Sequence, residues 1–244
     1  MKHLLKMFAI TVSLAATQAG ADMKMTFTGL AESLSGTPLY EEHHQVFGEC
    51  RDNHWHPTRH NVSYKDPGSV DSFATKELNY DLATSRPSFI FEQPRFNERL
   101  AVQNSEDRRL VIDWQSPEGR NERFRVDVDQ RVVVDAGFDQ FIRDNYRTLA
   151  RGDSLRLRFL APTRGAHYGF IAEPIQDRRV DAPLTVQIRA SGLLSRWFVD
   201  PILLGYDEQG FLTDYVGLTN VRMNNDENFT AHIRYQIDQA PSCG

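Results

Sequence analysis

The chain has 244 residues, of which 28 are Lys or Arg and 33 are Asp or Glu, so its formal net charge is −5. An acidic chain without a basic run argues against nucleic acid as a partner and against adhesion to anionic membrane surfaces. Hydrophobic residues make up 40% of the chain, which is enough for a folded core.

The first 21 residues have the layout of a secretory signal peptide. Met1 to Lys6 is basic, an apolar run extends from Met7 to Ala16, and the small residues Ala19 and Ala21 stand where a signal peptidase cuts. The apolar run is shorter than the ~20 residues that a membrane-spanning helix needs. We therefore predict cleavage after Ala21, a periplasmic location and no transmembrane segment in the mature chain.

Residues 22–244 are predicted to form a single β-rich domain. Short runs in which apolar and polar residues alternate are separated by turn residues, and we expect about ten to twelve strands. The clearest runs are Met25–Leu30, Leu39–Phe47, Arg123–Val128, Leu155–Leu160, Leu184–Ala190 and Phe229–Ile237.

One helix is expected among the strands, over Phe138–Leu149. Apolar residues recur there every three or four positions, beginning with Phe138, Phe141 and Ile142, so they share one helical face. Gly152 is a typical stop signal. The predicted fold is therefore mainly β, a curved antiparallel sheet or partial β-barrel with one packed amphipathic helix.

Two cysteines, Cys50 and Cys243, are present in the chain. In an oxidising compartment such a pair is interpreted as one disulfide, which would tie an early strand to the chain end. The alternative is two free thiols.

The segment Leu193–Leu204 is apolar on more than one face. Such a segment is either buried on both sides or exposes apolar surface to a ligand. We hypothesise that it forms the wall of a lipid-sized cavity together with the expected helix, and plain core packing is the alternative. The candidate ligand-binding residues are Leu193, Leu194, Trp197, Phe198, Phe138, Phe141 and Ile142.

Five of the eight histidines lie between His43 and His60. His54 and His56 stand at i and i+2, which places both side chains on one face of a strand, and His60 follows after a proline turn. Imidazoles grouped in this way bind copper or zinc, so these three are candidate metal ligands. A solvent-exposed loop over Arg51–His60 is the interpretation that we favour, because the block is polar.

Apparent catalytic patterns lack the context that their chemistry needs. Gly152–Leu155 spells the nucleophile block of the GDSL hydrolases, with Ser154 as nucleophile. In that family the block lies near the start of the mature chain and a D-x-x-H block follows near its end, whereas here it follows the expected helix and no D-x-x-H occurs. We expect a helix stop, no catalytic residue and no cofactor, and we interpret Glu41 and Glu42 as surface acids.

Four segments resemble a group of uncharacterised exported proteobacterial proteins. They are Leu39–His44, Val62–Gly68, Arg196–Ile202 and Gly217–Asn220. The group has no assigned activity, so the resemblance implies no catalytic residues. The strand-rich pattern with one helix is also similar to the unclosed β-barrels of periplasmic lipoprotein carriers, which fold a curved sheet around an apolar cavity. That likeness implies an architecture and not a function.

The function predicted from the sequence is a non-enzymatic periplasmic protein that binds a lipid or acyl chain in a cavity of the sheet. Burial of acyl surface would supply the affinity, at ~0.8 kcal/mol per CH₂. The first alternative is an interaction or assembly module of the cell envelope with no small ligand. The second is a metal carrier that uses His54, His56 and His60.

Overall fold

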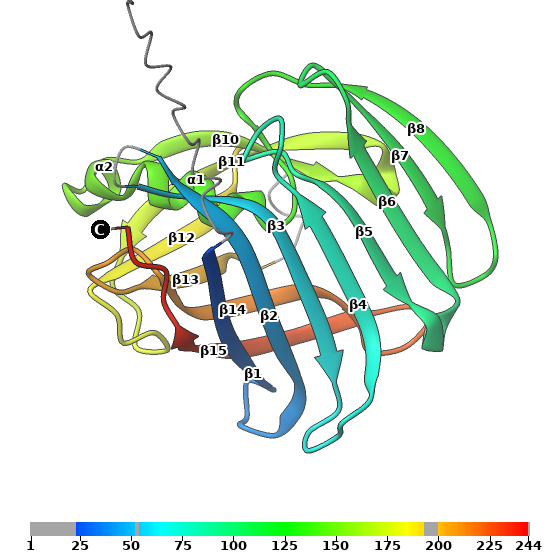
Figure 1. Cartoon of the computed structure of the whole chain (residues 1–244), viewed down its shortest axis with the longest axis horizontal. Coiled ribbons are helices and arrows are strands. Elements are labelled where there is room, and N and C mark those ends of the chain that lie inside the picture. Colours follow the sequence, from blue (N-terminus) through cyan, green and yellow to red (C-terminus); the bar gives the residue numbers. More distant parts are fainter. Residues whose placement is uncertain (1–22, 52–53, 193–199, 244) are drawn as a thin grey trace, which may run out of the picture.

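The computed structural model describes residues 23–51, 54–192 and 200–243, so the predicted signal peptide lies outside the described residues. The described chain forms one curled sheet of 15 strands in the order β8-β7-β6-β5-β4-β3-β2-β1-β15-β14-β13-β12-β11-β10-β9 (Figure 1). The first half of the chain supplies β1 (Met23–Glu32), β2 (Pro38–Arg51), β3 (His54–Lys65), β4 (Ser72–Asn79), β5 (Ser88–Gln93), β6 (Glu98–Asn104), β7 (Arg109–Gln115) and β8 (Asn121–Asp127).

The second half of the chain completes the sheet. Its strands are β9 (Val132–Val133), β10 (Leu155–Ala161), β11 (Ala166–Ile175), β12 (Leu184–Ala190), β13 (Ile202–Tyr206), β14 (Leu212–Arg222) and β15 (Asn228–Gln239). Neighbouring strands are antiparallel except β9 and β10, which are parallel. The predicted fold class is confirmed, but the strand count was too low. The sequence analysis missed β6 because charged and polar residues occupy its ends, and it missed β9 because that strand has only two residues.

The sheet is an open one, since β8 and β9 form its two edges without pairing with each other. The edges nevertheless approach, because the turn after β10 packs on β8. A Cβ on Gly165 would lie 2.3 Å from the ring of Phe124, and the Nε2 atom of His167 lies 3.2 Å from the carbonyl oxygen of Asp127. The curled sheet therefore encloses space although its hydrogen-bond ladder does not close.

A buried ion pair joins the two halves at a second place. Glu98 of β6 accepts bonds of 2.7 and 2.8 Å from the guanidinium of Arg222, at the end of β14. Trp114 and Gln93 also donate to Glu98, at 2.9 Å each. This network holds β5–β7 against β14 and fixes the curvature of the sheet.

The predicted helix is present but is broken into two pieces, α1 (Gly137–Asp144) and α2 (Tyr146–Ala150). The side-chain amide of Asn145 donates to the carbonyl oxygen of Phe141 at 2.8 Å, so a side chain occupies a backbone acceptor at the break. The helices lie at one end of the curled sheet (Figure 1) and pack on β10–β13. In the described ranges no helix is long and apolar enough to cross a membrane.

Three predictions about connections are resolved by the structure. Cys50 and Cys243 form a disulfide, as expected for an oxidising compartment. Gly152 follows the end of α2 with a positive φ of 97°, and β10 begins soon after, so Ser154 stands exposed between a helix and a strand. The prediction of an exposed loop over Arg51–His60 is wrong, because β3 begins at His54 and pairs with β2.

Candidate functional site

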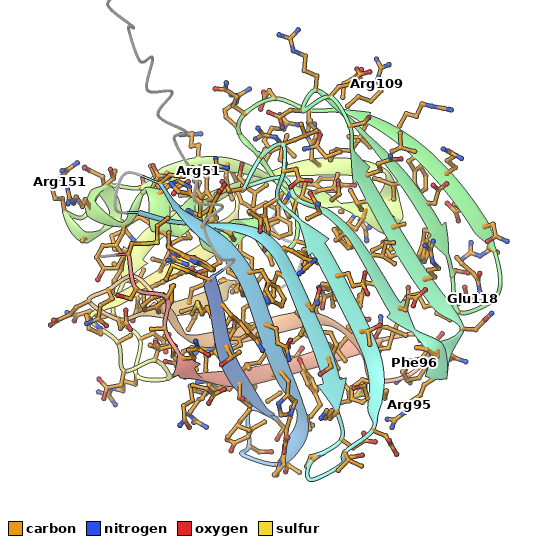
Figure 2. The ribbon with its side chains drawn as sticks, in the orientation of Figure 1. Arg51, Arg95, Phe96, Arg109, Glu118 and Arg151 are labelled. Carbon is orange, nitrogen blue, oxygen red and sulfur yellow. A yellow bond between two sulfur atoms is a disulfide. The ribbon has the colours of Figure 1, made fainter. Side chains whose placement is uncertain are left out.

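The concave side of the sheet encloses a cavity of about 440 Å³. Small-molecule sites commonly have volumes of about 300–1,000 Å³ and mostly apolar walls with a few placed polar groups. Charged side chains such as Arg109 and Arg151 lie on the outside of the molecule (Figure 2). Most of the cavity wall is apolar or aromatic, and it includes Met25, Phe27, Val46, Val62, Leu78, Phe89, Phe138, Phe159, Phe170, Ile202, Leu204, Leu212 and Ile233.

A chain of buried polar side chains crosses this apolar wall on β2, β3 and the loop after β4. Nε2 of His44 lies 3.0 Å from Oε2 of Glu42, and Nδ1 of His44 lies 2.9 Å from Nε2 of His60. Nδ1 of His60 in turn lies 3.4 Å from the hydroxyl of Tyr80. All four residues are buried and line the cavity.

The direction of these hydrogen bonds follows from the carboxylate at one end. Because Glu42 accepts, Nε2–H of His44 donates to it, Nε2–H of His60 donates to His44, and the hydroxyl of Tyr80 donates to Nδ1 of His60. For neutral imidazoles, this assignment gives every ring nitrogen a hydrogen bond. Burial lowers the pKa of His60 well below its usual value, and repulsion from His44, when that ring is protonated, and from Lys76 acts in the same direction.

Glu42 lies in a row of residues that crosses four strands. It is paired with Tyr64 of β3 on one side and with Gly29 of β1 on the other, and Gly29 is paired with Tyr235 of β15. A Cβ on Gly29 would lie 2.7 Å from the ring of Tyr235, so only glycine lets this ring pass over β1. The hydroxyl of Tyr235 then donates to Oε2 of Glu42 at 3.0 Å.

Tyrosine rings surround Glu42. Burial raises the pKa of Tyr64, Tyr215 and Tyr235, and in each case the charge of Glu42 is the next largest cause. The three hydroxyls therefore stay protonated at neutral pH. The prediction that Glu42 is a surface acid is wrong, because it is only 6% exposed and accepts hydrogen bonds from buried donors.

A buried ion pair lies on the next part of the wall. Nζ of Lys76 on β4 lies 2.9 Å from both carboxylate oxygens of Asp135, which also accepts from Asn220 at 2.9 Å. The same ammonium lies 4.6 Å from the ring centre of Phe91. Asp135 has a positive φ of 45° just before α1, so the backbone holds its carboxylate there against a conformational cost.

Helix α1 brings a second acid and its counter-charge to the cavity. Oδ2 of Asp139 lies 3.9 Å from a guanidinium nitrogen of Arg143, one turn further along. Burial raises the pKa of Asp139, while Arg143 and the hydroxyl of Tyr206 oppose the shift. Both acids beside α1 are thus accompanied by a cation.

The residues predicted to bind an apolar ligand have different positions. Phe138 lines the cavity, whereas Phe141 and Ile142 pack into the core between α1 and the sheet. Leu193, Leu194, Trp197 and Phe198 lie outside the described residues.

The three histidines proposed as metal ligands do not converge in the described structure. A bulge at Thr58 shifts the register of β3, so His60 is paired with buried Val46, while His56 is paired with exposed Glu49. His56 and His60 thus occupy opposite faces of the sheet, and the side chain of His54 is not described. In the part of the chain that the structure describes, no three His, Cys, Asp or Glu side chains are grouped to hold a metal.

The sequence analysis did not identify most of the polar residues that line the cavity, although alternation along the strands indicated some of them. Glu42 and His44 lie between apolar Tyr40 and Val46 at a spacing of two residues, which places all four on the inner face of β2. Lys76 has the same signal on β4, between Ala74 and Leu78. Asp135 has none, because a loop after a two-residue strand places it.

Comparison with known proteins adds one structural likeness. No protein-family model matches the chain, and no curated protein matches it. Among solved structures, it is similar to the beta-barrel-like protein of domain of unknown function DUF1849 from Brucella abortus, with a TM-score of 0.39 and 7% identity. The likeness covers 88% of this chain and 95% of that chain.

Proposed function

We propose that this protein is a non-enzymatic periplasmic binding protein that holds an amphiphilic ligand, with a lipid or acyl chain, inside the curled sheet. The cavity of about 440 Å³ carries the proposal, because its apolar wall suits a hydrocarbon chain and the connected polar groups from Glu42 to Tyr80 supply a place for a polar head. Burying an eight-carbon chain would contribute roughly 6 kcal/mol at about 0.8 kcal/mol per CH₂.

Two further observations support the proposal. The Cys50–Cys243 disulfide suits an oxidising compartment such as the periplasm. In addition, α1 and the turn after β10 contribute Phe138 and Pro162 to the wall, so side chains outside the strands cover the cavity. Such cover would keep an acyl chain out of water.

The proposal is tested by titration with N-phenyl-1-naphthylamine, an uncharged probe that fluoresces in apolar surroundings. We expect saturable binding that dodecanol displaces. Leu212 lines the cavity, so the larger ring of Leu212→Trp should take up cavity volume and weaken probe binding at least tenfold. Leu34→Trp is the control, because Leu34 is 62% exposed, and it should leave probe binding unchanged. Native mass spectrometry before and after solvent extraction would identify a co-purified ligand.

Absence of saturable probe binding, or equal binding by the two tryptophan variants, would refute the cavity as a ligand site. The alternative of an envelope assembly module without a small ligand would then account better for the disulfide-bonded chain. Crosslinking in intact cells would be the next measurement in that case.

A further inference from the structure

We propose that the polar part of the cavity binds an ammonium head group, with Glu42 as its counter-charge. This inference rests on the proposed binding function and names the class of ligand: a cationic amphiphile rather than a fatty acid. Glu42 is buried, lines the cavity and stands at the centre of the row that links β3, β2, β1 and β15.

Among the described residues, no Lys or Arg side chain pairs with Glu42, and its ion-pair contact is His44, which is a cation only when its ring is protonated. Lys76 is held by both oxygens of Asp135, and Arg143 accompanies Asp139. The donors that reach Oε2 of Glu42 are the ring of His44 and the hydroxyl of Tyr235. A buried carboxylate is costly without an opposite charge, and a ligand ammonium would supply that charge.

One carboxylate oxygen of Glu42 is available to such a ligand. Both donors at 3.0 Å bond to Oε2, which leaves Oε1 as the oxygen for a ligand, and the buried hydroxyl of Tyr40 is a further donor close to this carboxylate. Because Glu42 lines the cavity, a bound ammonium would reach it from the ligand side. A hydrogen bond between charged groups is about twice as strong as one between neutral groups.

The aromatic surroundings favour the same head group. Tyr64, Tyr215 and Tyr235 line the cavity near Glu42, and Phe27 packs 5.8 Å from the ring of Tyr235. The faces of aromatic rings attract ammonium and quaternary ammonium groups. An ammonium bound at Glu42 would therefore meet aromatic rings as well as the carboxylate.

A carboxylate head group does not fit this wall. It would meet the negative charge of Glu42, and the nearest ammonium, Lys76, already gives its hydrogen bonds to Asp135 and lies over the ring of Phe91. A neutral alcohol would gain a hydrogen bond to Glu42 but no ion pair. The expected order of affinity is therefore ammonium, alcohol, carboxylate.

The test compares ligands with the same chain and different heads. Dodecylammonium, dodecyltrimethylammonium, dodecanol and dodecanoate displace N-phenyl-1-naphthylamine at about pH 8, below their critical micelle concentrations. At this pH an unperturbed imidazole is neutral and an alkylammonium is protonated. We expect dodecylammonium to bind at least tenfold more tightly than dodecanoate.

Variants assign the preference to one carboxylate. Glu42→Gln should abolish the ammonium preference, so that dodecylammonium and dodecanol bind within twofold of each other, and a cooperative urea unfolding transition shows that the variant is folded. Glu41→Gln is the matched control, because Glu41 is the neighbouring acid on the other face of β2, where it contacts His43. If Glu42→Gln does not fold, the order of affinities in the unmodified protein decides.

The outcomes separate the two proposals. Equal displacement by all four ligands, or a preference for dodecanoate, overturns the ammonium site and leaves the binding function standing. A preference that persists in Glu42→Gln also overturns it. Failure of every ligand, dodecanol included, refutes the binding function itself.

Discussion

The ion pair between Lys76 and Asp135 makes a sharp prediction about stability. The side chains are 5% and 12% exposed, and Nζ lies 2.9 Å from both carboxylate oxygens. Removing one partner of such a pair leaves a buried charge without compensation, which costs about 3–5 kcal/mol. We therefore expect Lys76→Met to reduce the free energy of unfolding by about 3–5 kcal/mol.

Replacing both charges should recover much of this loss. Asparagine at position 135 tolerates the positive φ of 45° better than most residues and keeps a polar side chain beside Asn220. We expect the Lys76→Met/Asp135→Asn protein to be within about 2 kcal/mol of the unmodified protein, because neutral replacements of a buried pair are often tolerated.

The assay is urea unfolding at about pH 7 under non-reducing conditions, with a double-mutant cycle and a check that the m-value is unchanged. The matched surface control is Arg109→Met, which breaks an exposed ion pair with Asp127 and should cost less than about 1 kcal/mol. The reasoning fails if Lys76→Met costs no more than this control. It also fails if the double variant loses the sum of the two single losses.

Three further predictions concern His60, Gly137 and the disulfide. Because the pKa of His60 is lowered in the folded protein, the unfolded chain takes up a proton on this ring at a higher pH than the folded chain does. The free energy of unfolding should therefore be highest above about pH 6.5 and fall below it by up to about 1.4 kcal/mol per pH unit. In urea unfolding at a series of pH values, His60→Asn should flatten this slope. Gly137→Ala should cost about 2–3 kcal/mol and lower Tm, because its Cβ would lie 2.3 Å from the carbonyl oxygen of Ser85; an unchanged Tm would contradict this. Reducing the Cys50–Cys243 bond, which spans 193 positions, should cost about 2–5 kcal/mol, and identical urea midpoints with and without dithiothreitol would contradict that expectation.

The fold class could be predicted from the sequence because its signals are local. Alternation over Leu184–Ala190 and turn residues such as Asp207 report the conformation of a few neighbouring residues. Asp207 accepts hydrogen bonds from the backbone N–H groups of Gln209 and Phe211 and so stabilises the turn between β13 and β14. The predicted helix was likewise placed correctly, apart from its break at Asn145.

The polar residues of the cavity wall could be predicted only in part, because residues far apart in the sequence determine which of them are buried. Alternation places Glu42 on a particular face of β2, but burial of that face depends on Tyr235, which reaches it across Gly29. The bulge at Thr58 is equally invisible in the sequence, and it turns His60 inward while leaving His56 outside. One extra residue in a strand reverses the face of every residue beyond it.

The pairing of β1 with β15 has a consequence for the order of folding. In the described sheet, the other neighbouring strands follow one another along the chain, whereas the contact between Thr28 and Asp238 spans 210 positions. Loop closure makes such long-range pairing slow, while hairpins form within microseconds. Each half-sheet can therefore assemble early, but the cavity, which draws its wall from both halves, is complete only when the last strand docks beside the first.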